Sequence, residues 1–278
     1  MNISFDHIIH YVEHPKKTSE FLAKLGIHSV EGGKHETRGT NNYLSHFGLS
    51  YIELLGIFDR QLFRENEAAQ VTFSPFSTIE KDGFKEGFAR IALRTNNLHQ
   101  LAESLQNQGL STNGPVPLSR RRPDGTLIEW ELLYAHDEGS DLPLPFFIDW
   151  GSSDEDRYKE LSEQGIVQST QEKKLPFTKV VFSVRDLTKS VENWKRWFSL
   201  ESGPVFIDDT LQAKCQTLYL PGTNLVFAAE NGDGIVSSVL DERGERPFLV
   251  CLTNENSGYN QSISGGVYQL PSSFNLLK

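Results

Sequence analysis

His7 is a titratable side chain in the middle of an apolar, strand-like stretch near the start of the chain. The stretch runs from Phe5 to Val12, and the alternation of side chains along a strand places His7 on one face with Phe5, Ile9 and Tyr11. This histidine is therefore either a satisfied core residue or a side chain that projects into a pocket. In a pocket, its imidazole can bind a metal ion or a ligand.

Two glutamates and one arginine occupy comparable places further along the chain. Glu53 lies in Tyr51-Ile52-Glu53-Leu54-Leu55, and Trp130-Glu131-Leu132 mirrors the centre of that segment. Arg90 lies in Phe88-Ala89-Arg90-Ile91-Ala92-Leu93, which has the shape of the stretch around His7 at a displacement of 83 positions. Four polar side chains thus lie within segments of similar pattern.

A helical pattern follows each of the two similar stretches. The first helix is predicted to begin at Pro15 and to end at Gly26, and the second to be capped by Asn97 and to end at Gly109. Gly109 again lies 83 positions after Gly26. Two landmarks that share one displacement indicate an internal repeat of a strand, a helix and a group of strands.

Composition limits the classes of function. The 278-residue chain is 37% hydrophobic and 23% charged, which is usual for a folded protein with a substantial core. Its net charge of −10 argues against general binding to nucleic acids or anionic membranes. The chain has no secretory signal pattern and no apolar run near the ~18 residues of a membrane span, so we expect a cytoplasmic protein. Cys215 and Cys251 are expected to be buried thiols.

The sequence predicts two domains with a polar connection. Residues 1–151 form the first unit, which carries the candidate site, residues 152–175 a polar linker or helix, and residues 176–278 a second unit. A third copy of the strand begins at Phe177 and a fourth, shorter copy at Pro247, with its helix missing or reduced.

These motifs resemble a known family. Repeated modules that open with Asp-His-Ile and close with Ile-Glu-Leu are similar to the vicinal oxygen chelate superfamily of glyoxalases, extradiol dioxygenases and antibiotic-resistance proteins. Arg122-Pro123-Asp124-Gly125, followed by Trp130 and by Pro145-Phe146-Phe147-Ile148-Asp149-Trp150, resembles the subgroup of glyoxalase-like domain proteins. The resemblance implies an α+β fold in which repeated βαβββ modules pair into two curved mixed sheets.

In that superfamily the concave face of a sheet, here called the cup, holds a divalent metal. Its ligands come from the first and last strands of the paired modules. Carried over to this chain, the resemblance implies metal binding by His7, Glu53 and Glu131, with Zn, Mn, Fe or Ni as the ion and Glu53 and Glu131 as catalytic groups. Arg90 occupies the place of a further ligand, and a guanidinium has no lone pair to offer. No nucleotide cofactor is expected.

Because Arg90 replaces a residue that binds the metal in the superfamily, three alternatives stay open. The cup holds a metal; or Arg90 neutralises Glu53 or Glu131 and no metal binds; or Arg90 stays free to anchor a carboxylate or phosphate of the substrate. Arg122 is either a solvated loop residue or a second contact for an anionic substrate.

Aromatic residues near the cup, Trp130 and Trp150, are expected to bind substrate as a pocket wall. The segment that contains Trp150 also suits a plug between domains, and its Asp149 is a weak candidate base. His10 is expected to be structural, whereas His35 and His46 are expected at the surface.

The second pair of modules is expected to be degenerate. Lys179 stands at the place of His7, Val250 at that of Arg90, Ala228 at that of Glu53 and Gln269 at that of Glu131. None of them retains the ligand chemistry, so this pair is either structural or lines a metal-free pocket.

The resemblance favours a metal-dependent enzyme of the glyoxalase-like or dioxygenase-like type, a lyase, isomerase or ring-opening oxygenase. Its substrate is expected to be a small, oxygenated and anionic metabolite, and a homodimer is possible. The alternative is a metal-free protein that sequesters a small molecule, as resistance proteins of this superfamily do. A pure scaffold is disfavoured, because burying four ionisable groups without a function is costly.

Overall fold

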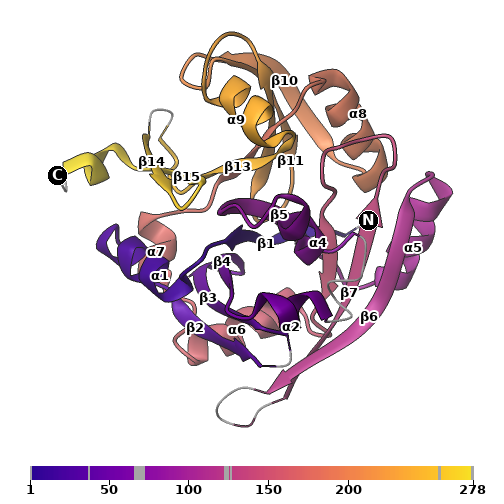
Figure 1. The fold of residues 1–278 in the computed structure, drawn as a ribbon, viewed down its shortest axis with the longest axis vertical. Coiled ribbons are helices and arrows are strands. Elements are labelled where there is room, and N and C mark those ends of the chain that lie inside the picture. Colours follow the sequence, from indigo (N-terminus) through magenta and orange to yellow (C-terminus); the bar gives the residue numbers. More distant parts are fainter. Residues whose placement is uncertain are drawn as a thin grey trace.

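The computed structural model describes residues 2–36, 38–65, 73–121, 125, 127–255 and 258–276. Within these residues the chain forms two curved mixed sheets, one of eight strands and one of seven (Figure 1). The strand orders are β2-β3-β4-β1-β5-β8-β7-β6 and β10-β11-β12-β9-β13-β15-β14.

The first sheet is built from two modules of the expected βαβββ order. The first module contains β1 (Ser4–Tyr11), α1 (Pro15–Lys24), β2 (Val30–His35), β3 (Thr40–Phe47) and β4 (Ser50–Ile57). Two short helices follow it, α2 (Arg60–Glu65) and α4 (Pro75–Lys81). The second module contains β5 (Gly87–Arg94), α5 (Leu98–Asn107), β6 (Ser111–Arg121), β7 (Leu127–His136) and β8 (Phe146–Asp149).

The two modules meet along their first strands. β1 pairs in antiparallel fashion with β5, while β1 is parallel to β4 and β5 is parallel to β8. Each module therefore places its first strand next to its last one. This pairing confirms the α+β architecture of paired modules that the sequence predicted.

The second sheet follows a helical connection. α6 (Asp154–Glu163) and α7 (Ser169–Lys174) lead to β9 (Lys179–Ser183), α8 (Leu187–Phe198), β10 (Glu201–Asp208), β11 (Ala213–Tyr219) and β12 (Asn224–Glu230). After α9 (Ile235–Arg243) come β13 (Arg246–Cys251), β14 (Tyr259–Ile263), β15 (Gly266–Leu270) and a short 3-10 helix (Ser272–Leu276). No helix occurs among the described residues between β13 and β14, so the last module has lost it as expected.

Local signals explain where the predicted helices begin and end. Pro15 occupies the first turn of α1, and Gly26, with a φ of 74°, follows its end. The side chains of Asn97 and Asp186 accept hydrogen bonds from the backbone N–H of Gln100 and Lys189, at 3.0 and 2.9 Å, and so cap α5 and α8.

The sequence prediction missed several strands, and two of them, β2 and β6, bear on the site. β2 contains Gly32 and Gly33, and β6 contains Gly114, Pro115 and Pro117, which are residues typical of loops. Both are edge strands, where a proline does not interrupt a central ladder. As a result the strand of Glu131 is the third of its module, and β8 is the fourth.

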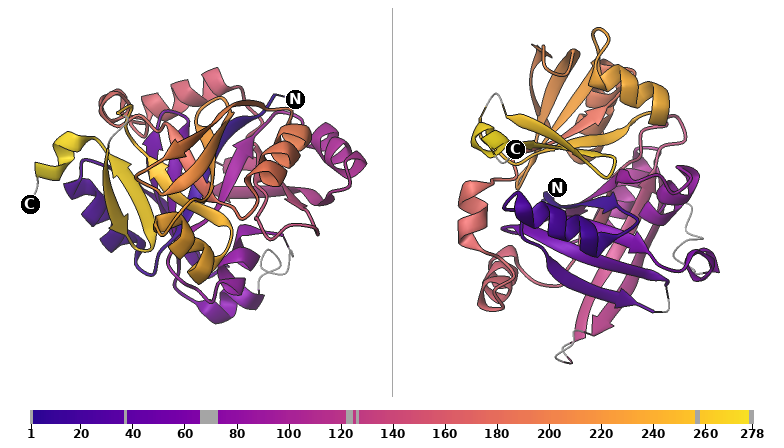
Figure 2. Two further views of the ribbon diagram at one scale, coloured as in Figure 1. Left: turned by 90° about the horizontal axis from the view of Figure 1, so that it is seen from above. Right: turned by 60° about the vertical axis from the view of Figure 1, so that its left-hand side comes forward.

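The two sheets pack with their helix-bearing faces towards each other, so one apolar core is shared by both halves. Figure 2 shows the C-terminal half stacked on the N-terminal half. Polar contacts also cross this boundary. The Nε2–H of His10 donates to the carbonyl of Ser264 at 2.9 Å, Nδ1 of His10 lies 2.7 Å from the hydroxyl of Tyr268, and Asp82 pairs with Arg243 and Arg246.

The concave face of the second sheet is filled. Val181, Val226 and Leu249 of the sheet pack there against Val236 and Leu240 of α9. Both cysteines, Cys215 and Cys251, are free and buried in the same cluster, and burial raises the pKa of each thiol to about 12. No helix among the described residues is long and apolar enough to cross a membrane.

Candidate functional site

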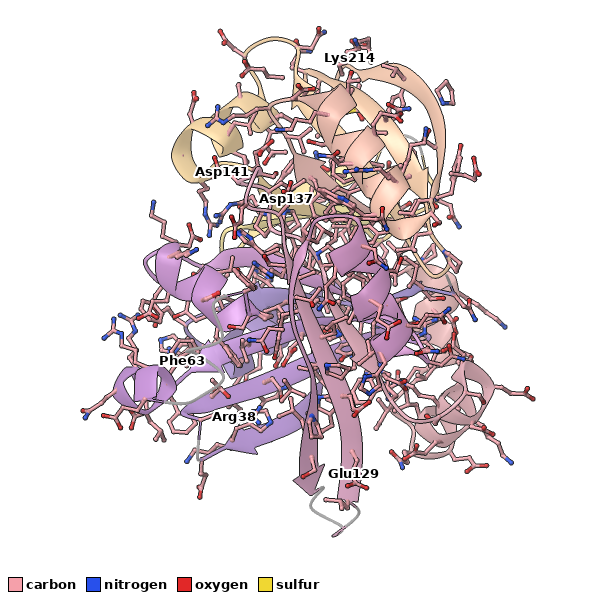
Figure 3. All side chains as sticks on the ribbon, turned by 90° about the vertical axis from the view of Figure 1, so that its right-hand side faces the viewer. Arg38, Phe63, Glu129, Asp137, Asp141 and Lys214 are labelled. Atoms are coloured by element: carbon pink, nitrogen blue, oxygen red, sulfur yellow. The ribbon has the colours of Figure 1, made fainter. Side chains whose placement is uncertain are left out.

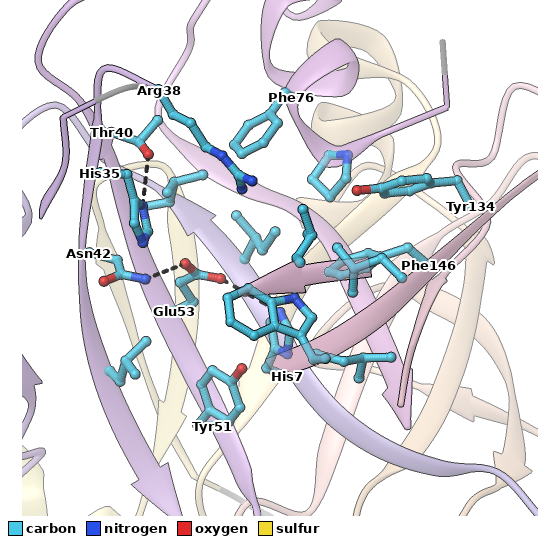
Figure 4. A pocket seen from close by; sticks show the side chains of 18 of the residues that line it. His7, His35, Arg38, Thr40, Asn42, Tyr51, Glu53, Phe76, Tyr134 and Phe146 are labelled. Carbon is cyan, nitrogen blue, oxygen red and sulfur yellow. Dashed lines mark hydrogen bonds and ion pairs between the residues drawn. The ribbon is translucent and has the colours of Figure 1, made fainter. Parts of the chain in front are cut away.

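The concave face of the first sheet, the cup, contains a cavity of about 140 Å³ (Figure 4). Side chains of β1, β3 and β4 form one wall, and side chains of β7 and β8 form the other. Residues at the start of α4 cover it from one side. The polar residues among its lining are His7, His35, Arg38, Thr40, Asn42, Tyr51, Glu53 and Tyr134.

A β-bulge shapes the first strand at the floor of the cavity. Phe5 lies opposite Leu93 and His7 opposite Ala92, so Asp6 is an extra residue in β1. Strict alternation would place Asp6 and His7 on opposite faces. Because the bulge breaks the alternation, Oδ1 of Asp6 reaches Nδ1 of His7 at 2.7 Å while His7 still lines the cavity.

Asp6 is fully buried and charged. Burial on its own raises the pKa of Asp6, but the hydrogen bond and charge of His7, with the more distant charges of Arg157 and Arg94, lower it to about 2. A deprotonated Asp6 can only accept, so Nδ1 of His7 carries the proton of this hydrogen bond. In the neutral ring, Nε2 then presents its lone pair on the other side.

The opposite ring nitrogen faces Glu53. Nε2 of His7 lies 3.6 Å from Oε2 of Glu53, and the Nδ2–H of Asn42 donates to the other carboxylate oxygen at 2.7 Å. Tyr51 stacks on the His7 ring at 4.5 Å, and Phe146 approaches it edge-on at 5.3 Å. The ring is thus fixed by packing on two sides and by the hydrogen bond of Nδ1 to Asp6, while the carboxylate of Glu53 lies beyond Nε2.

Arg38 brings a positive charge to the cavity. It follows β2, and Figure 4 shows its guanidinium pointing into the cavity between His35 and Tyr134. The guanidinium makes no ion pair or hydrogen bond with the residues that the structure describes. Such a group is well suited to bind a carboxylate or phosphate.

Both predicted aromatic residues lie at the cavity. Trp130 and Trp150 line it with their ring centroids 5.8 Å apart. The Nε1–H of Trp150 also donates to Oδ2 of Asp6 at 2.9 Å, and the guanidinium of Arg157 lies 3.6 Å from the centre of the Trp150 ring. Trp150 therefore joins the cavity wall to the carboxylate that orients His7.

Glu131 does not reach the cup. On β7 the cavity is lined by Trp130, Leu132 and Tyr134, so Glu131 points to the opposite face with Leu133. Glu129 shares that face and lies near the far end of the β6–β7 hairpin (Figure 3). The expectation that Glu131 binds a metal in the cup was therefore wrong.

The counterpart of Glu53 in the second module is Phe146. Glu53 lies opposite Ile9 of β1, and the repeat displacement of 83 carries Ile9 to Ala92, which lies opposite Phe146 of β8. An apolar ring thus occupies this last-strand position, and it contacts His7 directly.

Arg90 contacts neither glutamate. It falls in a second bulge, where Ala89 and Arg90 together face Ile9, and it lines a different cavity. Its Nε–H donates to the hydroxyl of Thr78 at 2.8 Å and its Nη1–H to the carbonyl of Phe73 at 2.6 Å. Arg90 therefore does not neutralise Glu53 or Glu131, because its described partners are Thr78 and Phe73.

The donors of the cup do not form the expected metal centre. His7 and Glu53 come together, but Glu131 faces away and Phe146 and Arg90 occupy the remaining positions. Although His35 also lines the cavity, no group of three or more His, Cys, Asp or Glu that could hold a metal is present among the described residues. Two protein donors do not fit the three that catalytic zinc or non-haem iron sites use.

Of the other residues considered from the sequence, His35 lies at the cavity, whereas Asp149 and His46 do not line it. Arg122 lies outside the described residues. Asp149 accepts a hydrogen bond from the N–H of Gly151 at 2.8 Å and does not line the cup. His35 lines the cavity and His46 is buried, so the expectation that both are surface residues was wrong. Burial lowers the pKa of His46 to about 4.

Comparison with known proteins identifies similar chains. Residues 5–198 match a family model described as a glyoxalase-like domain. None of the curated proteins compared with the chain matches it. A hypothetical protein from Staphylococcus aureus is 26% identical, and the match covers 96% of this chain and 98% of that one with a TM-score of 0.76.

A second solved structure is more distant. A mutant of 4-hydroxymandelate synthase from Streptomyces coelicolor is 12% identical, and the match covers 90% of this chain and 71% of that one with a TM-score of 0.56. At this identity the similarity concerns the fold alone.

Proposed function

The chain belongs to the family of glyoxalase-like domain proteins, and from this premise we propose that its cup is the active site of an enzyme that moves a proton on a small anionic metabolite. The observation that carries the proposal is the arrangement of Asp6, His7 and Glu53 at a cavity that also contains the guanidinium of Arg38. The reaction class is isomerase or lyase chemistry at a carbon next to a carbonyl group.

His7 is the acid–base group in this proposal. Its Nε2 takes a proton from the substrate carbon, while the charged Asp6 holds Nδ1–H and stabilises the imidazolium that forms. The same Nε2 then returns the proton to a neighbouring atom of the substrate, which completes an isomerisation. Glu53, held by Asn42, keeps the ring aligned and attracts its positive form.

Arg38 and the aromatic wall select the substrate. The guanidinium of Arg38 binds a carboxylate or phosphate of the metabolite, and Trp130, Phe76 and Phe146 contact its carbon atoms. A cavity of about 140 Å³ limits this substrate to a few carbon atoms besides its charged group.

Metal-dependent steps are not part of this proposal. Oxygenation by non-haem iron uses two histidines and a carboxylate, and the cup offers one close pair, His7 and Glu53. A divalent ion that entered the cup would have these two residues as its protein ligands.

The alternative function is a binding protein that sequesters a small molecule without turnover. The mostly apolar walls and the two tryptophans favour it, because such a pocket can hold a ligand by burial alone. For either function we propose a cytoplasmic protein, monomeric or homodimeric, whose partner is a small molecule. Its net charge of −10 disfavours nucleic acids and anionic membranes.

The test is solvent deuterium incorporation, measured by proton NMR, into a panel of 2-oxo acids and hydroxy ketones. Wild-type protein should exchange at least one of them, and His7→Ala and Glu53→Gln should not. His99→Ala is the matched control, because His99 is an exposed histidine on α5. Tight binding of a panel member without exchange would support the sequestering protein instead.

A further inference from the structure

A second cavity, larger than the cup, lies where the two halves of the protein meet. It has a volume of about 400 Å³ and no lining residue in common with the cup. Helix α4 separates the two, because Pro75 and Phe76 line the cup while Thr78 and Lys81 line this cleft. Figure 3 shows Asp141, another of its lining residues, beside the C-terminal half.

Positive charge dominates this interdomain cleft. Its lining contains five cationic side chains, Lys81, Arg90, Arg185, Arg243 and Arg246, against three carboxylates, Asp82, Asp141 and Glu245. The first half supplies Lys81 and Arg90 and the second half supplies the other three. The whole chain carries a net charge of −10, so this local excess is opposite to the charge of the protein.

The carboxylates do not neutralise all of these cations. Asp82 is shared by Arg243 and Arg246, and it leaves one positive charge in that group. Glu245 accepts a hydrogen bond from the backbone N–H of Arg185 at 2.7 Å. The Nε of Arg243 is buried without a hydrogen-bond partner among the described residues.

Arg90 is the deepest of the cations and has only neutral partners. Its side chain is nearly fully buried, and its two described hydrogen bonds go to the hydroxyl of Thr78 and the carbonyl of Phe73. Burial lowers the pKa of Arg90 to about 10, and the guanidinium stays charged at neutral pH. A buried charge without a counter-ion is costly, and a bound anion would remove that cost.

We propose that this interdomain cleft binds a small metabolite that carries two negative charges, as a phosphate monoester or a dicarboxylate does. Arg90 contacts one oxyanion at the bottom of the cleft, and Arg185 and Lys81 contact the anion from its rim. The volume fits a small metabolite rather than a polymer. Because residues from both halves contribute, the bound anion also holds the halves together. The site is independent of the reaction proposed for the cup.

The test is isothermal titration calorimetry of the full chain with inorganic phosphate and with succinate, at an ionic strength kept constant with sodium chloride. At least one of the two anions should bind with a saturable heat. Arg185→Gln and Lys81→Gln should each weaken binding about tenfold, since both residues are exposed cleft cations whose loss leaves the fold intact. Arg90→Met should abolish binding.

Arg196→Gln is the matched control, because Arg196 is an exposed arginine of α8 outside the cleft, and it should bind as the wild type does. The two anions distinguish a phosphate site from a dicarboxylate site. If neither anion gives a saturable heat, or if Arg185→Gln and Lys81→Gln bind as tightly as the wild type, the proposal is wrong. The two rim variants decide the matter even if Arg90→Met does not fold.

Discussion

The carboxylate of Asp6 lies 2.7 Å from Nδ1 of His7, although the two residues are neighbours in one strand. A regular strand turns adjacent side chains to opposite faces, and the bulge at Asp6 removes that constraint. The bulge therefore converts a sequence neighbour into the group that orients the histidine.

Asp6→Asn should lower turnover by a factor of about 10² to 10⁴, because the asparagine amide no longer stabilises the imidazolium. Steady-state kinetics on a substrate found by deuterium exchange measures this effect, with KM nearly unchanged. A variant with wild-type turnover would remove Asp6 from the catalytic role.

The same residue should make stability sensitive to acid. Asp6 has a pKa of about 2 in the folded chain against an ordinary value of 3.8, so the unfolded chain binds more protons between these values. Its contribution of about 2 kcal/mol is present above pH 4 and is lost as the pH falls towards 2. Urea unfolding of wild type and Asp6→Asn across this range should show a steeper pH dependence for the wild type.

His10 should produce a second pH effect at the boundary between the halves. Burial lowers the pKa of His10 from 6.5 to about 4. The hydrogen bond to Ser264 partly offsets this shift, and the charge of Arg243 adds to it. The unfolded chain therefore binds the extra proton as the pH falls from about 6.5 to 4, and about 3 kcal/mol of stability is lost over that window.

His10→Gln should lose less stability between pH 7 and pH 5 than the wild type does. The free energy of unfolding at both pH values measures the difference, with His99→Ala as the exposed control. An equal loss of stability in wild type and His10→Gln would contradict the buried, neutral state of His10.

Phe146→His should create a metal site with three protein donors in the cup. The substitution places a third donor beside His7 and Glu53, at the position that corresponds to Glu53 in the second module. Metal analysis after dialysis against zinc should give about one ion per chain for the variant and much less for the wild type. If wild-type protein binds one zinc ion per chain and His7→Ala loses it, the cup has a further metal ligand besides His7 and Glu53, and the prediction is wrong.

Asp82→Asn should weaken the contact between the halves. Asp82 pairs with both Arg243 and Arg246, and its loss leaves two largely buried guanidinium groups without a carboxylate partner. The expected cost is about 3–5 kcal/mol in the free energy of unfolding. Chemical denaturation measures it, and Asp209→Asn is a control at an exposed turn. A change below about 1 kcal/mol, the size expected for a solvated pair, would mean that the two arginines do not depend on Asp82.

Much of the architecture was predictable from the sequence because the repeat is visible in residue types. The strand around His7, its copy around Arg90 and the capped helices after each of them carry clear local signals. β2 and β6 were missed because glycine and proline in an edge strand look like a loop. The division into residues 1–151, 152–175 and 176–278 stays a prediction, since it concerns units that fold separately.

The site was only partly predictable. His7, Glu53, Trp130 and Trp150 were selected from the sequence and line the cavity, whereas Glu131 faces away from it. That error follows from the missed strand, because counting β7 as the last strand put Glu131 in the place that Phe146 occupies.

Three residues of the site could not be selected from strand alternation, the repeat or the family motifs. Asp6 reaches His7 because of a bulge, and Arg38 reaches the cavity from a turn. Asn42 holds Glu53 through a hydrogen bond between neighbouring strands. A charged residue next to a strand histidine is the one pattern that would have pointed to Asp6.

The measurement that tests the central claim most directly is the turnover of His7→Gly in the presence and absence of added imidazole. The account predicts that the variant loses activity by a factor of at least about 100 and that free imidazole restores part of it, because the ligand enters the space between Asp6 and Glu53. Wild-type turnover by His7→Gly without imidazole would contradict the account.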